Sequence, residues 1–211
     1  RDLEADLSLL EAHGCDMVFR GTLEQFFPEI ASIDDIEILP AGRFGHGLEE
    51  EFRPGHLDGV RTIVNRLFKV VGPARAYFGE KDFQQLRIIE NLIKEKKFNI
   101  KLIRCETIRS EDGLALSSRN KKLNFSSKII ATNLFKALNF AKEKIDVLCI
   151  DEIEKKISDK LSNFKEIELE YFVIADEKNL KPIRHKKAEQ YRAFIAAYVS
   201  GVRLIDNVKL Y

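Results

Sequence analysis

The sequence predicts an α/β protein with a Rossmann-like, doubly wound parallel sheet, followed by a smaller C-terminal α+β domain. Between residues 58 and 105 the patterns alternate in the order helix, strand, helix, strand, which is typical of a parallel sheet. After residue 120 the order changes to helices followed by adjacent strands, which favours an antiparallel sheet. We place the boundary near Thr107, so that residues 1–106 form the nucleotide-binding domain and residues 107–211 form a lid domain.

The first elements are weakly patterned. Leucines at Leu3, Leu7 and Leu10 predict a helix over residues 3–13, which Gly14 would end. A strand is expected at 17–19, and irregular structure over 21–51, with 36–39 as a candidate strand. Asp58 is expected to cap a helix that runs to residue 71. Its sheet-facing side would carry Val60, Ile63, Val64, Leu67 and Val71.

The remaining elements have clearer signals. Residues 74–78 predict a buried strand, 83–97 a helix with Leu86, Ile89, Leu92 and Ile93 on one face, and 100–105 a second strand. In the lid domain we expect helices at 126–145 and 151–163 and strands at 167–175 and 191–199.

Composition excludes several classes of protein. With 211 residues and 45% hydrophobic residues, the chain can bury a substantial core. Lysine and arginine (35) balance aspartate and glutamate (34), so nothing indicates binding to nucleic acid or to an anionic membrane. Cys15, Cys105 and Cys149 are too scattered for a disulfide framework or a zinc site, which favours a reducing, cytoplasmic compartment. No long apolar stretch or signal peptide is evident in this sequence.

The junction between the strand at 74–78 and the helix at 83–97 predicts a phosphate site. Such a turn lies at the carboxyl end of a parallel strand, where helix N–H groups attract anions. Gly79 would let a ligand approach the backbone, and Lys81 adds a positive charge. The alternative is that Gly79 only turns the chain and Asp82 only caps the helix.

A second polar loop, residues 109–120, favours the phosphate interpretation. Ser117, Ser118 and Arg119 place two hydroxyls beside a forked cation, which suits a polyphosphate on which charge moves. The serines could equally form a turn before the next helix.

At these motifs the chain resembles the pantothenate synthetases, members of the adenylating nucleotidyltransferase superfamily. The resemblance is carried by Leu48 and Glu49 with residues 53–56 and 59–60, by residues 78–86, by residues 112–120 and by the ending 203–207. It implies a ligase that joins pantoate to β-alanine with ATP through a pantoyl-adenylate, releasing AMP and pyrophosphate. It also implies a homodimer, and Mg²⁺ accompanies the polyphosphate although no ligand cluster is evident.

The resemblance assigns roles residue by residue. It makes Lys81, Ser117 and Arg119 catalytic. It makes Gln85, one turn after Lys81, the pantoate ligand, with Arg53 and His56 toward the β-alanine end. Its ATP-binding residues are Gly79, Glu80, Lys81, Asp82, Ile108, Leu116, Ser117, Ser118 and Arg119.

One departure keeps other functions open. The family's N-terminal His-x-Gly-His signature, which holds ATP phosphates, is not found around His13, His46, His56 or His185. We therefore expect the parallel sheet to be N-terminally incomplete and this chain alone to be inactive until an upstream signature is restored. The alternatives are a non-catalytic fragment or subunit, and another nucleotidyltransferase of the superfamily that makes a dinucleotide cofactor.

Overall fold

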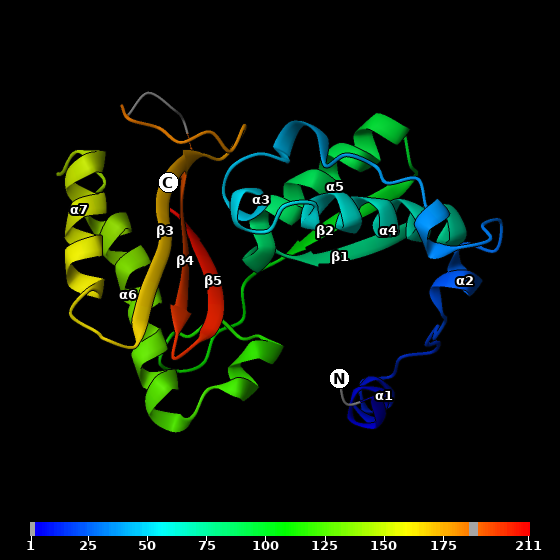
Figure 1. Ribbon diagram of the computed structural model, residues 1–211, viewed down its shortest axis with the longest axis horizontal. Helices are drawn as coiled ribbons and strands as arrows, with labels where there is room; N and C mark the ends of the chain where they lie inside the picture. Colours follow the sequence, from blue (N-terminus) through cyan, green and yellow to red (C-terminus); the bar gives the residue numbers. More distant parts are fainter. Residues whose placement is uncertain (1–2, 186–189) are drawn as a thin grey trace. The chain divides into compact units, whose positions relative to one another are not determined.

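A computed structural model describes residues 3–185 and 190–211 (Figure 1). The chain divides into two compact units, Arg1–Ile38 and Leu39–Tyr211. The second unit contains both sheets and all of the predicted site residues. The predicted boundary near Thr107 stays a prediction.

The first unit is built from short helices. It contains α1 (Leu3–Ala12), α2 (Leu23–Phe26) and the 3-10 helix η1 (Ile33–Asp35). Helix α1 confirms the helix that the leucine spacing predicts. The strand expected at 17–19 is wrong, because this segment has no regular secondary structure and pairs with no strand in the described residues. Met17 and Phe19 are 84% and 64% exposed, so no buried face selects a sheet register.

The second unit begins with irregular chain, as predicted. It holds η2 (Gly42–Phe44), α3 (Glu49–Phe52) and α4 (His56–Val71), and the candidate strand at 36–39 is absent from the described structure. Asp58 does not cap α4; the N-cap is Gly55, and the Asp58 carboxylate accepts a 2.5 Å hydrogen bond from the Ala41 N–H. Val71 is 62% exposed, because the face that packs inward is centred on Leu57, Val64 and Phe68.

The parallel sheet contains β1 (Ala74–Gly79) and β2 (Ile100–Cys105), joined by η3 (Glu80–Asp82) and α5 (Phe83–Lys96). The register pairs Ala74 with Ile100 and Gly79 with Cys105. Helices α4 and α5 pack on one face of β1, whose residues alternate between half-buried and exposed rather than being buried throughout (Figure 1). The predicted parallel α/β arrangement is confirmed, with both strands ending at the same edge.

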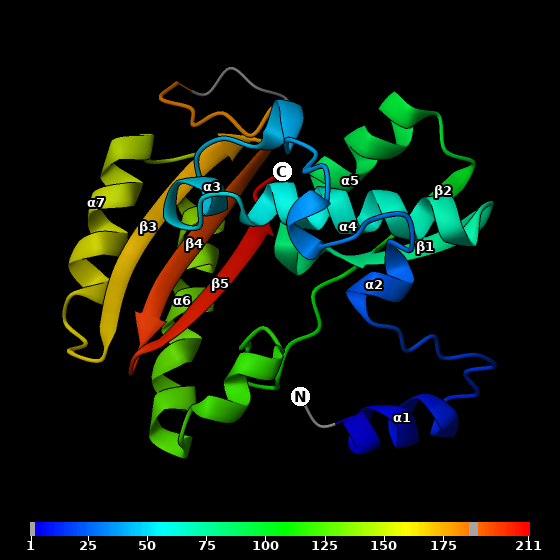
Figure 2. The same cartoon turned by 45° about the vertical axis from the view of Figure 1, so that its right-hand side comes forward.

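The C-terminal part is an antiparallel sheet covered by helices. Strands β3 (Ile167–Asp176), β4 (Tyr191–Val199) and β5 (Val202–Lys209) lie in that order, with a bulge between Leu169 and Tyr171. Helices α6 (Phe125–Lys144) and α7 (Ile150–Leu161) cover one face of this sheet (Figure 2). A large apolar core lies between the two helices and the sheet. The α+β prediction is confirmed, although β5 was not foreseen as a strand.

Across residues 3–185 and 190–211, every helix is too short or too polar to cross a bilayer.

Candidate functional site

Lys81 lies where β1 ends and α5 begins, as the sequence predicts. Residue 82 is the N-cap of α5, but its side chain makes no capping hydrogen bond; the Asp82 carboxylate lies 3.7 Å from the Lys81 ammonium. Gly79 has an ordinary extended backbone, and a Cβ there would meet no atom within 4 Å. The space beside Gly79 is therefore open to a ligand rather than filled by the protein.

The loop before α6 is a tight turn that depends on glycine. Gly113 has φ +90°, and a Cβ at this position would lie 2.3 Å from the Phe135 ring, so only glycine fits. The Ser110 N–H donates to the Leu114 carbonyl at 2.9 Å, and the Leu116 N–H donates to the Ile108 carbonyl at 2.9 Å. These bonds close residues 108–116 into a hairpin-like loop that delivers the next residues to the site.

The 3-10 helix η4 (Ser118–Lys122) presents the polar residues of this loop. The Ser117 hydroxyl donates to the Asn120 side-chain oxygen at 2.8 Å, and the Asn120 amide donates to the Ala115 carbonyl at 3.0 Å. Asn120 is buried and thereby fixes the orientation of Ser117. The sequence predicts two hydroxyl donors here, whereas the Ser117 hydroxyl already donates its proton to Asn120.

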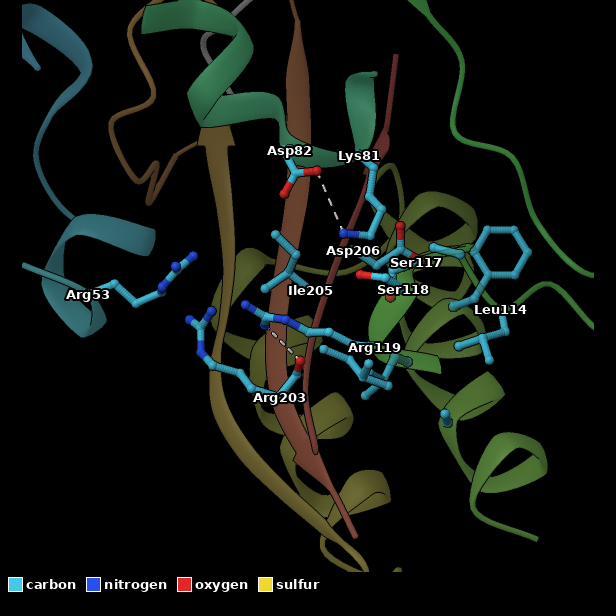
Figure 3. Close-up of a pocket in the computed structure, with 15 residues that line it drawn as sticks. Arg53, Lys81, Asp82, Leu114, Ser117, Ser118, Arg119, Arg203, Ile205 and Asp206 are labelled. Carbon is cyan, nitrogen blue, oxygen red and sulfur yellow. Dashed lines mark hydrogen bonds and ion pairs between the residues drawn. The ribbon is translucent and has the colours of Figure 1, made fainter. Parts of the chain in front are cut away.

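Cationic side chains from separate segments line one cavity of about 230 Å³, called here the first cavity (Figure 3). Figure 3 shows Lys81 entering from the β1–α5 junction, Arg119 from η4 and Arg203 from β5, with Arg53 reaching in from the end of α3. Ser117 and Ser118 lie on the same wall. The first cavity therefore concentrates positive charge where hydroxyl groups are also available.

The cations differ in how far their charge is already neutralised. Arg203 pairs with Glu49 through two 2.8 Å hydrogen bonds and also with Glu170. Burial alone would lower the pKa of Arg203, but these two carboxylates raise it. Arg119 instead donates to the Arg203 carbonyl at 2.9 Å, and in the described part of the chain no carboxylate forms an ion pair with it. Arg119 thus keeps its charge for an anionic ligand.

A second cavity adjoins the first and contains the other predicted substrate residues. His56 and Gln85 line the second cavity, while Arg53, Lys81 and Asp82 line both. Burial and the charge of Arg53 lower the pKa of His56, so its imidazole is neutral near pH 7. Lys81 therefore lies between a compartment with Arg119 and a compartment with Gln85.

The wall of the second cavity is a buried ionic cluster. Burial opposes the ionised form of Glu49, but hydrogen bonding to Arg203 holds the pKa of this carboxyl below its usual value. The Tyr171 hydroxyl donates to Glu49 at 2.9 Å; burial and the Glu49 charge raise the pKa of Tyr171, which stays protonated. Glu49 consequently ties α3 to β3 and β5.

Three predicted ATP-binding residues lie apart from this charge. The Glu80 carboxylate is directed to Arg192 at 3.6 Å and Arg104 at 4.0 Å, outside both cavities. Ile108 is 68% exposed, and Leu116 is 51% exposed beside another hollow that Phe125 also lines. Ile108 and Leu116 offer apolar surface next to the loop rather than contacts within the first cavity.

A family model matches almost the whole sequence. The model described as pantoate-beta-alanine ligase covers residues 1–209. The chain belongs to the pantoate-beta-alanine ligase family.

Curated relatives and solved structures of this family agree with the match. The chain is 38% identical to the pantothenate synthetase of Cytophaga hutchinsonii over 97% of this chain and 72% of the relative. It is 39% identical to the enzyme of Christiangramia forsetii over 100% of this chain and 74% of the relative. The fold matches the pantothenate synthetase of Thermus thermophilus with a TM-score of 0.90 at 35% identity, over 100% of this chain and 75% of that one.

One further similar structure is a complex with ligands. It is the pantoate-beta-alanine ligase of Francisella tularensis complexed with beta-gamma ATP and beta-alanine. The TM-score is 0.75 at 30% identity, and the match covers 100% of this chain and 70% of that one.

Sequence reasoning did not single out several residues that line the two cavities. Arg203, Ile205 and Asp206 line the first cavity, and Asn207 lines the second. All four lie in the run 203–207, which carried the family resemblance without individual roles. The available signal was the presence of polar Arg203, Asp206 and Asn207 among the apolar residues of this run.

The magnesium implied for the ligase family finds no ligand set here. Asp82 and Asp206 are the carboxylates that line the first cavity, and both oxygens of Asp206 accept hydrogen bonds from Arg109 at 2.6 and 2.9 Å. Within residues 3–185 and 190–211, no group of three His, Cys, Asp or Glu side chains could hold a metal ion. The described residues do not fit a protein-bound magnesium ion.

Proposed function

We propose that this chain, together with the family's His-x-Gly-His segment, joins pantoate to β-alanine with ATP through a pantoyl-adenylate. A pantoate carboxylate oxygen attacks the α-phosphorus of ATP, and the bond from that phosphorus to pyrophosphate breaks. The amine of β-alanine then attacks the acyl carbon, the bond to AMP breaks, and the amine releases a proton. Family membership supports the overall reaction, and the shared position of Lys81 between the cavities carries the assignment of the site.

The first step concentrates negative charge, so catalysis depends on positioning and on cations. In this proposal Lys81 and Arg119 contact the phosphates in the first cavity, and Ser118 donates its hydroxyl. Ser117 donates as well when a phosphate oxygen replaces Asn120 as the acceptor of its proton. Arg119 suits this role because a carboxylate partner would compete with the ligand, and none of the described residues provides one. Gly79 and Asp82 border the nucleotide at the start of α5, with Ile108 and Leu116 as apolar contacts.

The second cavity would hold the acid and the amine. Gln85 provides both a donor and an acceptor, which suits a substrate that carries hydroxyl groups and a carboxylate. Arg53 is one-third exposed and lies 3.7 Å from Glu49, so it can turn toward the β-alanine carboxylate. His56, neutral because of burial and Arg53, can accept the proton that the amine releases.

The assembly and the metal remain part of this proposal. We expect a cytoplasmic homodimer, and sedimentation analysis would measure the oligomeric state. We also expect Mg²⁺ to enter with ATP as its counter-ion.

The test measures each half of the reaction separately. Pyrophosphate should form from ATP only when pantoate is present, and sustained AMP release should need β-alanine as well. Arg119→Ala should suppress pyrophosphate release, whereas Arg184→Ala should not. The Arg184 side chain is 64% exposed, and neither it nor its partners Asp151 and Glu154 line either cavity. If a folded protein that carries both this chain and the His-x-Gly-His segment hydrolyses ATP without pantoate, or releases no pyrophosphate, the proposal is contradicted.

A further inference from the structure

Lys81 has little that fixes its position through its own side chain. Its ammonium lies 3.7 Å from Asp82, whose side chain is 49% exposed, so this ion pair is weak. The backbone of the Lys81 segment is held from elsewhere. The Asn207 side-chain amide donates to the carbonyls of Glu80 and Lys81, at 2.9 and 2.8 Å. One amide of β5 thus secures two consecutive peptide groups of η3.

The Asn207 amide is locked in one orientation. Its oxygen accepts a 2.5 Å hydrogen bond from Arg192, whose guanidinium stacks 3.8 Å from the centre of the Phe83 ring. Asn207 is 4% exposed. Turning the amide over would direct its oxygen at two carbonyl oxygens and its NH₂ group at a cation. The donors are therefore held facing η3.

The neighbouring residue holds the opposite wall of the first cavity. Asp206 accepts both hydrogen bonds from Arg109, and Arg109 also donates to the Gly113 carbonyl at 3.1 Å. The Asn207 N–H donates to Asp206 at 2.8 Å. Asp206 lines the first cavity together with Lys81 and the serines of the loop (Figure 3). Adjacent residues of one strand thus hold the segment that carries Lys81 and the loop that carries Arg119.

We propose that Asn207 is the positioning residue of Lys81: its amide sets where the ammonium meets the phosphates. This inference rests on the proposed function. Asn207 acts through the backbone of residues 80 and 81 and needs no contact with the substrate. Because a misplacement of about 1 Å can cost about 100-fold in rate, loss of the amide should slow the adenylating step.

The first variant is Asn207→Asp, which keeps the shape and the acceptor for Arg192 but removes both donors. Asn163→Asp is the matched control, since the Asn163 amide also donates to a carbonyl, that of Asp159 at 3.2 Å, but at an exposed position after α7. Pantoate-dependent pyrophosphate release should fall about 10- to 100-fold in N207D and stay within about 2-fold in N163D. Thermal unfolding establishes that each variant is folded.

A double-mutant cycle separates positioning from general damage. In a Lys81→Ala background, N207D should change the rate by no more than about 2-fold, because the group it positions is gone. Equal fold losses in both backgrounds, or no loss when Lys81 is present, would overturn the inference. If N207D fails to fold, Asn207→Ala enters the same cycle and is judged by the same outcomes. If the wild-type protein that carries the His-x-Gly-His segment releases no pyrophosphate, the proposed function itself is overturned.

Discussion

Replacing Lys81 by alanine should separate catalysis from stability. The Lys81 side chain is 18% exposed, and its ion-pair partner in the described structure is Asp82, at 3.7 Å and half-exposed. Such a pair contributes about 0–1 kcal/mol to folding, so the variant should remain folded at room temperature. The fold itself therefore does not depend on this ammonium.

The effect on the reaction should be much larger. A charge-assisted hydrogen bond to a phosphate is worth about 1.5–3 kcal/mol, and each 1.4 kcal/mol is a factor of ten in rate. Lys81→Ala should therefore slow pyrophosphate release by about 10- to 150-fold. The substitution should therefore change the rate of pyrophosphate release far more than the free energy of unfolding.

The assay is single-turnover pyrophosphate release with ATP and pantoate, combined with thermal unfolding of the same samples. Lys96→Ala is the control, because Lys96 is an exposed lysine in the last turn of α5, away from both cavities. Wild-type release from a well-folded Lys81→Ala variant would refute the reasoning. A large loss of stability would show that Lys81 has a structural role that its contacts do not reveal.

Further predictions concern the second cavity and its wall. Gln85→Leu should weaken pantoate binding by about 5- to 150-fold, from the loss of about 1–3 kcal/mol of hydrogen bonding, and calorimetry should find ATP affinity within about 2-fold. Arg203→Met should lower the free energy of unfolding by about 3–5 kcal/mol in urea, because it strands Glu49 and Glu170, whose side chains are 10% and 12% exposed. Since the pKa of Glu49 is lower in the folded state than its ordinary value of 4.5, its stabilisation is fully present above that value. This contribution is lost as the pH falls through the folded pKa, so urea titrations should find less acid destabilisation in Glu49→Gln.

Each of these predictions can fail in a specific way. Equal losses of pantoate and ATP affinity in Gln85→Leu would remove Gln85 from the acid site. Arg184→Met is the matched control for Arg203→Met, because the Arg184 side chain is 64% exposed, and equal small effects would mean that the Arg203 cluster is solvated. Identical pH dependence of unfolding in the wild type and in Glu49→Gln would show that Glu49 does not titrate as its surroundings imply.

The sequence by itself determined the elements that have strong periodic patterns. The helices around residues 56–71 and 83–96, the strands around 74–79 and 100–105, and the parallel order were all readable, because each pattern repeats over several turns or alternations. Lys81 and Arg119 were also readable as candidates, because each lies in a polar segment that follows a strand. Gln85, in α5, was a candidate through the family resemblance and its position one turn after Lys81. The short segments 17–19 and 36–39 were misread because three or four apolar residues do not reveal whether a partner strand exists.

Only the tertiary structure decided how these loops are held together. Asn207 lies more than a hundred residues from the Glu80 and Lys81 carbonyls that it holds, and Asp206 is almost as remote from Arg109 along the chain. No local pattern encodes such pairings, since they depend on how β5 pairs with β4 and where the sheet packs against η3. The ion pairs of Glu80 with Arg192 and of Arg203 with Glu49 likewise join residues that are distant in the sequence. Adjacent charges in the sequence reveal nothing about which carboxylate a cation reaches, so only the packed chain shows that Arg203 is neutralised by Glu49 while Arg119 remains available to a ligand.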